Sequence, residues 1–180
     1  MALNFVQKSL QNSPISIENL CKTTKDFVLA TIHRAENTGD RLRLNSLIET
    51  LSNFDIPVVL PAHPRLVDRC NTFDIELSKG SLIIVPPLSH RELIAAAIAS
   101  KSVVTDSGGL QKECFLLKVP CSTIRTETEW KETLVNEWNI IVDDLSDLQG
   151  LSKRLAPESE QPTPFGNGKT AEKIIDCLFE

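Results

Sequence analysis

The sequence predicts an α/β fold, built on a parallel β-sheet with helices on both faces. Two observations lead to this prediction. Short apolar runs of about four to six residues recur along the chain, and longer stretches with helical patterning separate them. Runs that are apolar throughout are typical of strands buried on both faces, as in parallel sheets. Their alternation with helical stretches indicates successive β–α–β units.

The first half of the chain supplies three strands and two helices to this pattern. FVLATI at 27–32 and PVVLPA at 57–62 are predicted strands, because both are short and almost wholly apolar. A helix is predicted over 40–53, and a shorter one near 64–72 begins with a proline, which suits the first helical position. SLIIV at 81–85 is the third predicted strand.

The second half continues the alternation. The segment 89–99 is rich in good helix formers, SVVTD at 102–106 is a predicted strand, and a helix follows from 108 to about 117. The remaining expected elements are short strands near 120–124 and 139–142, each leading into a helix, and a closing helix at 168–179 after the Pro- and Gly-rich connection 156–168. Right-handed crossovers between these strands would give a doubly wound, Rossmann-like domain.

The main domain is expected to span residues 27–180 and to hold the whole sheet. Residues 1–26 fit poorly as a core strand or helix of their own, and we interpret them as a partly helical lead-in segment. Such a segment would normally arrive from another folded unit. It is the first indication of a missing partner domain.

Composition and charge exclude several classes of function. The formal net charge of −5 argues against a nucleic-acid-binding surface. No apolar run approaches the ~20 residues needed to cross a bilayer, and the N-terminus lacks a signal-peptide pattern. The five cysteines are scattered and form no C-x-x-C pair, so neither a disulfide framework nor a zinc site is expected. We therefore expect a cytoplasmic protein with reduced thiols and no bound metal.

The strongest local signal is VVTDSGGLQKE at 103–113. A strand ends at Asp106, a turn follows at Ser107, Gly108 and Gly109, and a helix begins at once. The glycines let the backbone approach a ligand, and the unpaired N–H groups at the positive end of the helix suit a diphosphate. The alternative is that Ser107 is only an N-cap in a tight turn.

Glu113 favours a nucleotide as the ligand of this turn. It lies four residues after Gly109 and therefore shares its helix face. A carboxylate there would repel phosphates, but it can accept hydrogen bonds from ribose hydroxyls, as acidic residues do in dinucleotide folds. The alternative is a solvated glutamate on the helix surface.

Basic side chains follow three other expected strands. His33 and Arg34 come directly after the first strand, and His63 comes after the second. Arg125 follows the fifth. Because ligands of parallel sheets bind at the carboxyl ends of the strands, His33 and Ser107 are expected to face one cleft. Helix capping after His33, and a surface ion pair of Arg125 with a nearby glutamate, are the alternatives.

Five motifs together resemble the non-hydrolysing UDP-N-acetylglucosamine 2-epimerases, and they occur in the order seen in that family. They are HRAEN (33–37), AHP (62–64), TDSGGLQKE (105–113), RTETEW (125–130) and FGNGKTAEKI (165–174). Such enzymes resemble GT-B glycosyltransferases, in which two Rossmann-like domains face each other across a cleft. The resemblance covers about residues 27–180. It implies that this segment is the C-terminal, UDP-binding half, and that the N-terminal catalytic domain is absent from the sequence.

The resemblance also implies roles for the matching residues. His33 matches the active-site histidine of the family. In the UDP site, the turn formed by Ser107, Gly108 and Gly109 would hold the diphosphate. Glu113 would bind the ribose hydroxyls, and Arg125 would reach the phosphate region. Arg34 and His63 match an allosteric UDP-sugar site of bacterial members. Departures from the family pattern, among them Lys112, Leu93 where an aromatic residue stacks on uracil, and Phe165, leave the exact hexosamine open.

The activity implied by the resemblance is interconversion of UDP-N-acetylglucosamine and UDP-N-acetylmannosamine without a cofactor. The full enzyme could form a homodimer, and no nucleic-acid or membrane partner is expected. Because the family's catalytic carboxylates lie in the missing half, this chain is expected to be inactive alone. Two alternatives stay open, namely the donor-binding half of a GT-B glycosyltransferase and a stand-alone UDP-sugar-binding module.

Overall fold

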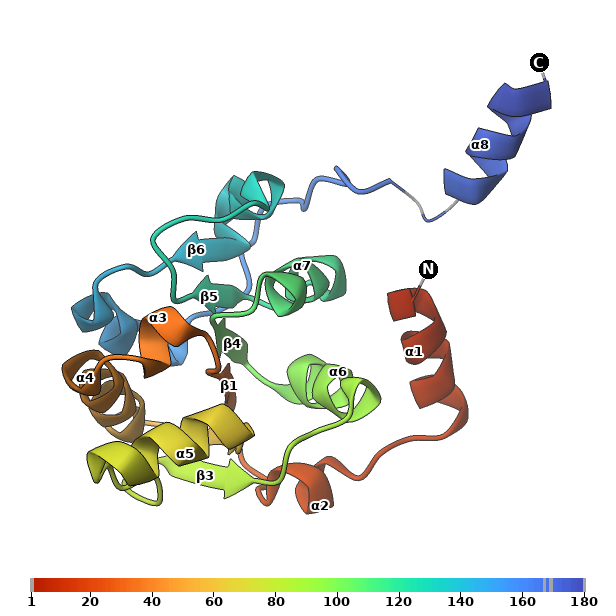
Figure 1. The fold of residues 1–180 in the computed structure, drawn as a ribbon. Coiled ribbons are helices and arrows are strands. Elements are labelled where there is room, and N and C mark those ends of the chain that lie inside the picture. The colour runs from red at the N-terminus through yellow and green to blue at the C-terminus, as the bar shows by residue number, and fades with distance from the viewer. Residues whose placement is uncertain (1, 167, 169, 180) are drawn as a thin grey trace.

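A six-stranded parallel sheet forms the centre of the molecule, and helices cover both of its faces (Figure 1). The computed structural model describes residues 2–166, 168 and 170–179. The strands are β1 (Val28–Thr31), β2 (Val58–Pro61), β3 (Leu82–Val85), β4 (Ser102–Thr105), β5 (Cys121–Thr123) and β6 (Asn139–Ile141). Their order in the sheet is β3-β2-β1-β4-β5-β6. The predicted α/β, Rossmann-like class is confirmed.

The helices follow the predicted alternation with two differences. They are α1 (Ala2–Asn12), α2 (Ile17–Cys21), α3 (Ala35–Thr38), α4 (Arg41–Ser52), α5 (Pro64–Phe73), α6 (His90–Ala99), α7 (Gly108–Leu117) and α8 (Thr170–Phe179). The short α3 was not expected. The helices predicted after β5 and β6 are the 3₁₀ segments η1 (Lys131–Glu137) and η2 (Leu145–Lys153). In η1, Val135 and Asn136 have non-helical dihedral angles that interrupt the hydrogen-bond ladder.

The sheet separates two apolar cores, because successive side chains of a strand point to opposite faces. Val28 and Ala30 of β1 belong to one cluster, which α4, α5 and η2 cover. Leu29 belongs to the other, with residues of α2, α6 and α7. Figure 1 shows α3, α4 and α5 on one side of the sheet and α6 and α7 on the other. Burial on both faces explains why the strands are apolar throughout.

The lead-in segment is helical and packs against the domain. Leu3 and Val6 of α1 form a small cluster with Ile94 of α6. Cys21 of α2 and Phe27, just before β1, are buried in the core that includes α6 and α7. The start of the chain thus covers the outer side of α6, a placement that the sequence pattern alone did not predict.

Helix α8 stands apart from the rest of the chain in Figure 1. None of its described residues is buried. Ile174, Ile175 and Leu178, which share one helix face, are each more than half exposed. No helix among the described residues is long and apolar enough to span a membrane.

The turn before β3 depends on Gly80, and this generates a first prediction. Gly80 has a φ of +55°, and a Cβ atom there would lie 2.1 Å from the carbonyl oxygen of Ser52. Gly80→Ala should therefore lower the free energy of unfolding by at least about 2 kcal/mol, measured by urea denaturation. Gly150→Ala is the control: nothing lies within 4 Å of its Cβ position, and its effect should stay within about 1 kcal/mol. Equal effects would contradict the steric argument.

Candidate functional site

The candidate site lies at the carboxyl ends of β1 and β4, which are neighbours in the sheet and whose following connections pass to opposite faces of it. After β1 it continues to α3 and α4 on one face of the sheet, and after β4 it continues to α7 on the other. Such a switch point opens a crevice at the carboxyl ends of the strands, because the two connecting loops diverge. The residues predicted from the sequence gather around this crevice.

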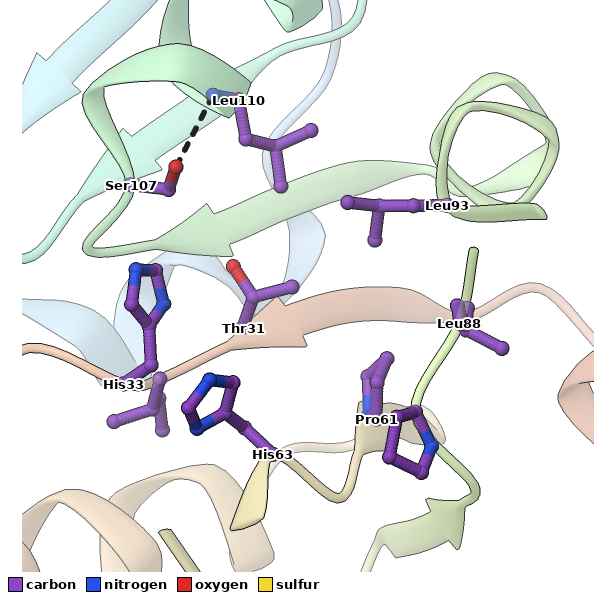
Figure 2. A pocket seen from close by; sticks show the side chains of 10 residues that line it. Thr31, His33, Pro61, His63, Leu88, Leu93, Ser107 and Leu110 are labelled. Carbon is purple, nitrogen blue, oxygen red and sulfur yellow. Dashed lines mark hydrogen bonds between the residues drawn. The ribbon is translucent and has the colours of Figure 1, made fainter. Parts of the chain in front are cut away.

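A cavity of about 240 Å³ occupies the crevice (Figure 2). Its polar wall carries the side chains of His33, His63 and Ser107. The apolar lining consists of Ile32, Pro61, Pro87, Leu88, Leu93 and Leu110. The sequence-based expectation that His33 and Ser107 flank one concavity is therefore confirmed. A chamber with one apolar wall and a few polar groups suits a flat ring carrying a polar substituent.

Asp106 connects the two loops that form the crevice. Its carboxylate is fully buried and accepts hydrogen bonds from the backbone N–H groups of His33 and Arg34 at 2.9–3.2 Å. It also accepts one from the side-chain amide of Asn37, at 3.2 Å. The His33 Nδ1 atom lies 3.0 Å from Asp106 Oδ1. A buried carboxylate needs such partners, and together they hold the β1–α3 loop against the end of β4.

This contact shifts the protonation of both partners. The hydrogen bond that the His33 ring donates to Asp106 raises the pKa of His33 above its ordinary value of 6.5, against the opposing effect of burial. Burial by itself raises the pKa of Asp106, but the hydrogen bonds from the His33 ring and from the two backbone N–H groups outweigh it, and the pKa is lowered. With Nδ1 facing Asp106, the Nε2 atom of His33 is left for a ligand or a proton.

His63 lies beside His33, with their ring centroids 5.4 Å apart. It is also the N-cap of α5, where its Nδ1 atom accepts a hydrogen bond from the backbone N–H of Arg65. Pro64 occupies the first helical position, as predicted. The capping contact fixes the orientation of the His63 ring at the cavity wall, so a structural and a binding role are compatible here.

The Ser107–Gly109 turn has the geometry of a helix start that is open to a ligand. Ser107 caps α7 by accepting a hydrogen bond from the backbone N–H of Leu110 at 3.3 Å (Figure 2). The first N–H groups of a helix have no acceptor inside the helix, so those of Gly108 and Gly109 are oriented toward the crevice end of α7. The N-cap alternative and the anion-site prediction therefore describe the same turn.

Arg125 reaches this turn from the end of β5. Its Nη1 atom lies 2.7 Å from Glu129 Oε2, which is the surface ion pair considered as an alternative. The pair lies directly over the turn: a Cβ atom at Gly108 would be 2.4 Å from Glu129 Oε1 and 3.3 Å from Arg125 Nη1. Glu129 thus places a carboxylate next to the start of α7, where an anion is predicted to bind.

Glu113 and Arg34 lie at the margins of the crevice rather than in the cavity. Glu113 pairs with His90 at the start of α6, with 2.7 Å between Oε1 and Nε2. Arg34 and Arg125 line a second cavity of about 310 Å³, with Asn37, Arg43 and Glu127 among the other residues. His63 faces the first cavity, so the structure does not bring the Arg34 and His63 side chains to a common pocket.

Sequence reasoning missed three residues of this arrangement. The sequence pattern predicts Asp106 only as the last residue of a strand, although a carboxylate that ends an apolar run needs buried partners. Asn37 is buried and bridges Asp106 to the carbonyl oxygen of Ile124, which links the ends of β4 and β5. The third is His90, for which no local pattern gave a signal. Within the described residues, no cluster of histidine, cysteine and carboxylate side chains could hold a metal ion.

Comparison with known proteins gives one consistent family. The sequence profile described as UDP-N-acetylglucosamine 2-epimerase matches residues 1–179. A UDP-N-acetylglucosamine 2-epimerase homolog from Methanococcus maripaludis is 34% identical, covering 98% of this chain and 50% of the relative. A UDP-2,3-diacetamido-2,3-dideoxy-D-glucuronate 2-epimerase from Pseudomonas aeruginosa is also 34% identical, covering 98% of this chain and 49% of the relative.

A solved structure has the same fold. The UDP-GlcNAc 2-epimerase of Methanocaldococcus jannaschii, in complex with UDP-GlcNAc and UDP, superposes with a TM-score of 0.76 at 29% identity. The match covers 98% of this chain and 52% of that structure. The chain spans about half the length of the relatives that it matches.

The Asp106–His33 contact generates a prediction about titration. Asp106→Asn replaces the charged acceptor that holds a proton on the His33 ring with a neutral amide, so the His33 pKa should fall relative to wild type. NMR titration of the His33 ring protons measures this change. Asp40→Asn removes the same charge from the N-cap of α4 and should leave the His33 titration unchanged. An unchanged His33 midpoint in Asp106→Asn would disprove the proposed coupling.

The same contact predicts how stability depends on pH. A raised His33 pKa contributes stability that is fully present below pH 6.5, the unfolded-state value, and is lost as the pH rises through the folded-state pKa. Unlike His33, Asp106 has a lowered pKa, so its contribution is lost as the pH falls through that value. Denaturant unfolding should therefore show a larger stability gap between wild type and Asp106→Asn at about pH 6 than at about pH 9.

Proposed function

The chain belongs to the UDP-N-acetylglucosamine 2-epimerase family, and we propose that it is the UDP-sugar-binding half of an epimerase of this kind. The observation that carries the proposal is the cavity beside the Ser107–Gly109 turn, at the switch point of the sheet. The cavity has an apolar wall for a base. The adjacent turn supplies backbone N–H groups for a diphosphate, and the Arg125 guanidinium lies next to Gly108 of that turn.

In this proposal, each part of UDP contacts residues of matching chemistry, from the base to the diphosphate. The apolar wall, which includes Leu88, Leu93 and Leu110, would take the uracil ring. Glu113, one helical turn beyond Leu110, would accept hydrogen bonds from the ribose hydroxyls. The helix start at Gly108 and Gly109 would hold the diphosphate, which must displace the Glu129 carboxylate from its position over Gly108. A leucine in place of an aromatic residue offers contact with uracil but no ring stacking, so base binding is weaker.

His33 is the residue that we propose for proton transfer. Its Nδ1 atom faces Asp106, and its Nε2 atom is available at the cavity. The reaction breaks the C1–O bond to UDP and removes the C2 proton, and UDP is then re-added after the proton returns from the other face. Arg125 and the helix amides would stabilise the negative charge that develops on the departing diphosphate.

The second proton-transfer group belongs, in this proposal, to a partner domain. Removal and return of a proton on opposite faces require groups on both sides of the sugar, and His33 lies on one side only. The chain covers about half of each relative, and the exposed apolar face of α8 offers a surface for that partner. The complete enzyme would therefore close the cleft with a second domain.

A carboxylated sugar is the second candidate substrate. The Pseudomonas aeruginosa relative is named for a UDP-linked glucuronate derivative. The second cavity, of about 310 Å³, is lined by three arginines and two glutamates, and the arginines are Arg34, Arg43 and Arg125. Calorimetric comparison of UDP-N-acetylglucosamine with the corresponding UDP-uronate tests this idea. Tighter binding of the uronate, lost in Arg43→Gln, would favour the second candidate.

The binding proposal predicts that UDP binds more tightly than uridine, by at least about tenfold, because the helix start holds the diphosphate. Gly109→Val should abolish this difference, since a side chain blocks the approach of a phosphate to the backbone. The substitution is compatible with the fold, because only Ser107 Oγ lies within 4 Å of its Cβ position, at 3.8 Å. Calorimetry with both ligands provides the measurement. Equal affinities in wild type would overturn the assignment of the turn.

The division of catalytic groups predicts no detectable epimerisation by this chain alone. Without the opposite wall, the sugar stays in water and the proton cannot be returned from the second face. NMR can follow UDP-N-acetylglucosamine and UDP-N-acetylmannosamine during a long incubation. Steady turnover that is lost in His33→Ala would refute the prediction. Release of UDP that depends on an added sugar acceptor would instead support a glycosyltransferase.

A further inference from the structure

His90 and Glu113 form a bridge between the two helices that border the candidate site. His90 is the first residue of α6, and Glu113 lies in the second turn of α7. The His90 Nε2 atom is 2.7 Å from Glu113 Oε1, although the two residues are 23 positions apart in the sequence. The Glu113 side chain is 26% exposed, so one partner of this bridge is largely withdrawn from solvent.

The bridge lies on the same helix faces as the apolar wall of the cavity. On α6, His90 precedes Leu93 by three residues, and on α7, Glu113 follows Leu110 by three residues. Residues three apart share a helix face, and both leucines line the cavity. The bridge therefore marks the rim of the pocket, beyond the apolar wall and one turn behind Gly109.

We propose that His90 is a positioning residue that fixes the Glu113 carboxylate for the two vicinal hydroxyls of a ribose, so that the chain selects ribonucleotides over 2′-deoxyribonucleotides. This inference rests on the proposed function, because it requires a nucleoside diphosphate in the cavity. His90 occupies Oε1 of the carboxylate and leaves Oε2 to accept a hydrogen bond from a hydroxyl group.

The physical reason for this positioning role is the conformational freedom of a glutamate side chain that has no partner. Its long side chain has several rotamers, and restricting them on binding costs free energy, about 1 kcal/mol for such a side chain. A bridge formed before the ligand arrives removes part of that cost. A ligand that lacks the 2′-hydroxyl gives the oriented, half-buried carboxylate one hydrogen bond fewer, and the cost of that loss lowers its affinity relative to the ribonucleotide.

Stability measurements alone would not reveal this role. Ion pairs between partly exposed side chains contribute about 0–1 kcal/mol to folding, so losing the bridge should change unfolding little. The ratio of the two affinities, for UDP and for 2′-deoxy-UDP, is the quantity that distinguishes positioning from a structural contact. It is also insensitive to losses that affect both ligands equally.

The test is calorimetric titration of UDP and 2′-deoxy-UDP into wild type, His90→Ala, His90→Gln and Glu92→Ala. Wild type should favour UDP by about tenfold, as expected for one lost hydrogen bond to a charged group. His90→Ala should reduce this preference to about twofold or less, mainly through weaker UDP binding. His90→Gln should restore most of it, because its amide can still donate to Glu113.

Glu92→Ala is the structural control. It removes the capping box that Ser89 and Glu92 form at the same end of α6, without touching Glu113. This variant should be less stable but should keep the preference for UDP. An unchanged preference in His90→Ala, or a wild type that binds both nucleotides equally, would overturn the positioning role. A wild type that binds UDP no better than uridine would instead overturn the proposed function on which it rests.

Discussion

The buried carboxylate of Asp106 is the contact on which the candidate site depends. It ends β4 and accepts hydrogen bonds from the loop that follows β1, so it joins the two connections that diverge at the switch point. The same carboxylate holds the His33 ring, which places a residue of one loop over the turn of the other. A charge buried this deeply is tolerated because its partners donate to it from both backbone and side chains.

The proposed binding of a diphosphate requires a local source of positive potential, because the formal net charge of the chain is −5. Two groups provide positive potential next to Gly108. They are the first N–H groups of α7, which have no acceptor within the helix, and the Arg125 guanidinium. Glu129 already places a carboxylate there, so the electrostatic preference of the turn is visible within the chain itself. An incoming diphosphate carries more charge than this glutamate and can use both the amides and the arginine.

Three residues from separate motifs, Lys112, Trp130 and Phe165, pack against one another. The Lys112 Nζ atom is 3.9 Å from the ring centroid of Trp130 and 4.5 Å from that of Phe165, and the two rings meet edge to face. Cation–π contacts of this kind attach the loop after β5 and the segment before α8 to helix α7. Residues that are far apart in the sequence therefore form one packing unit on α7.

The sequence by itself determined the order of strands and helices along the chain, the parallel class of the sheet and the position of the Ser107–Gly109 turn. Local patterns indicate these features, namely apolar runs, helix formers and turn residues. Each such pattern involves only a few neighbouring positions. Only the tertiary structure decided which distant side chains meet: His33 with Asp106, 73 positions away, His90 with Glu113, and Arg34 in a different cavity from His63. Such contacts depend on strand order and helix rotation, which bring together residues that no short pattern connects.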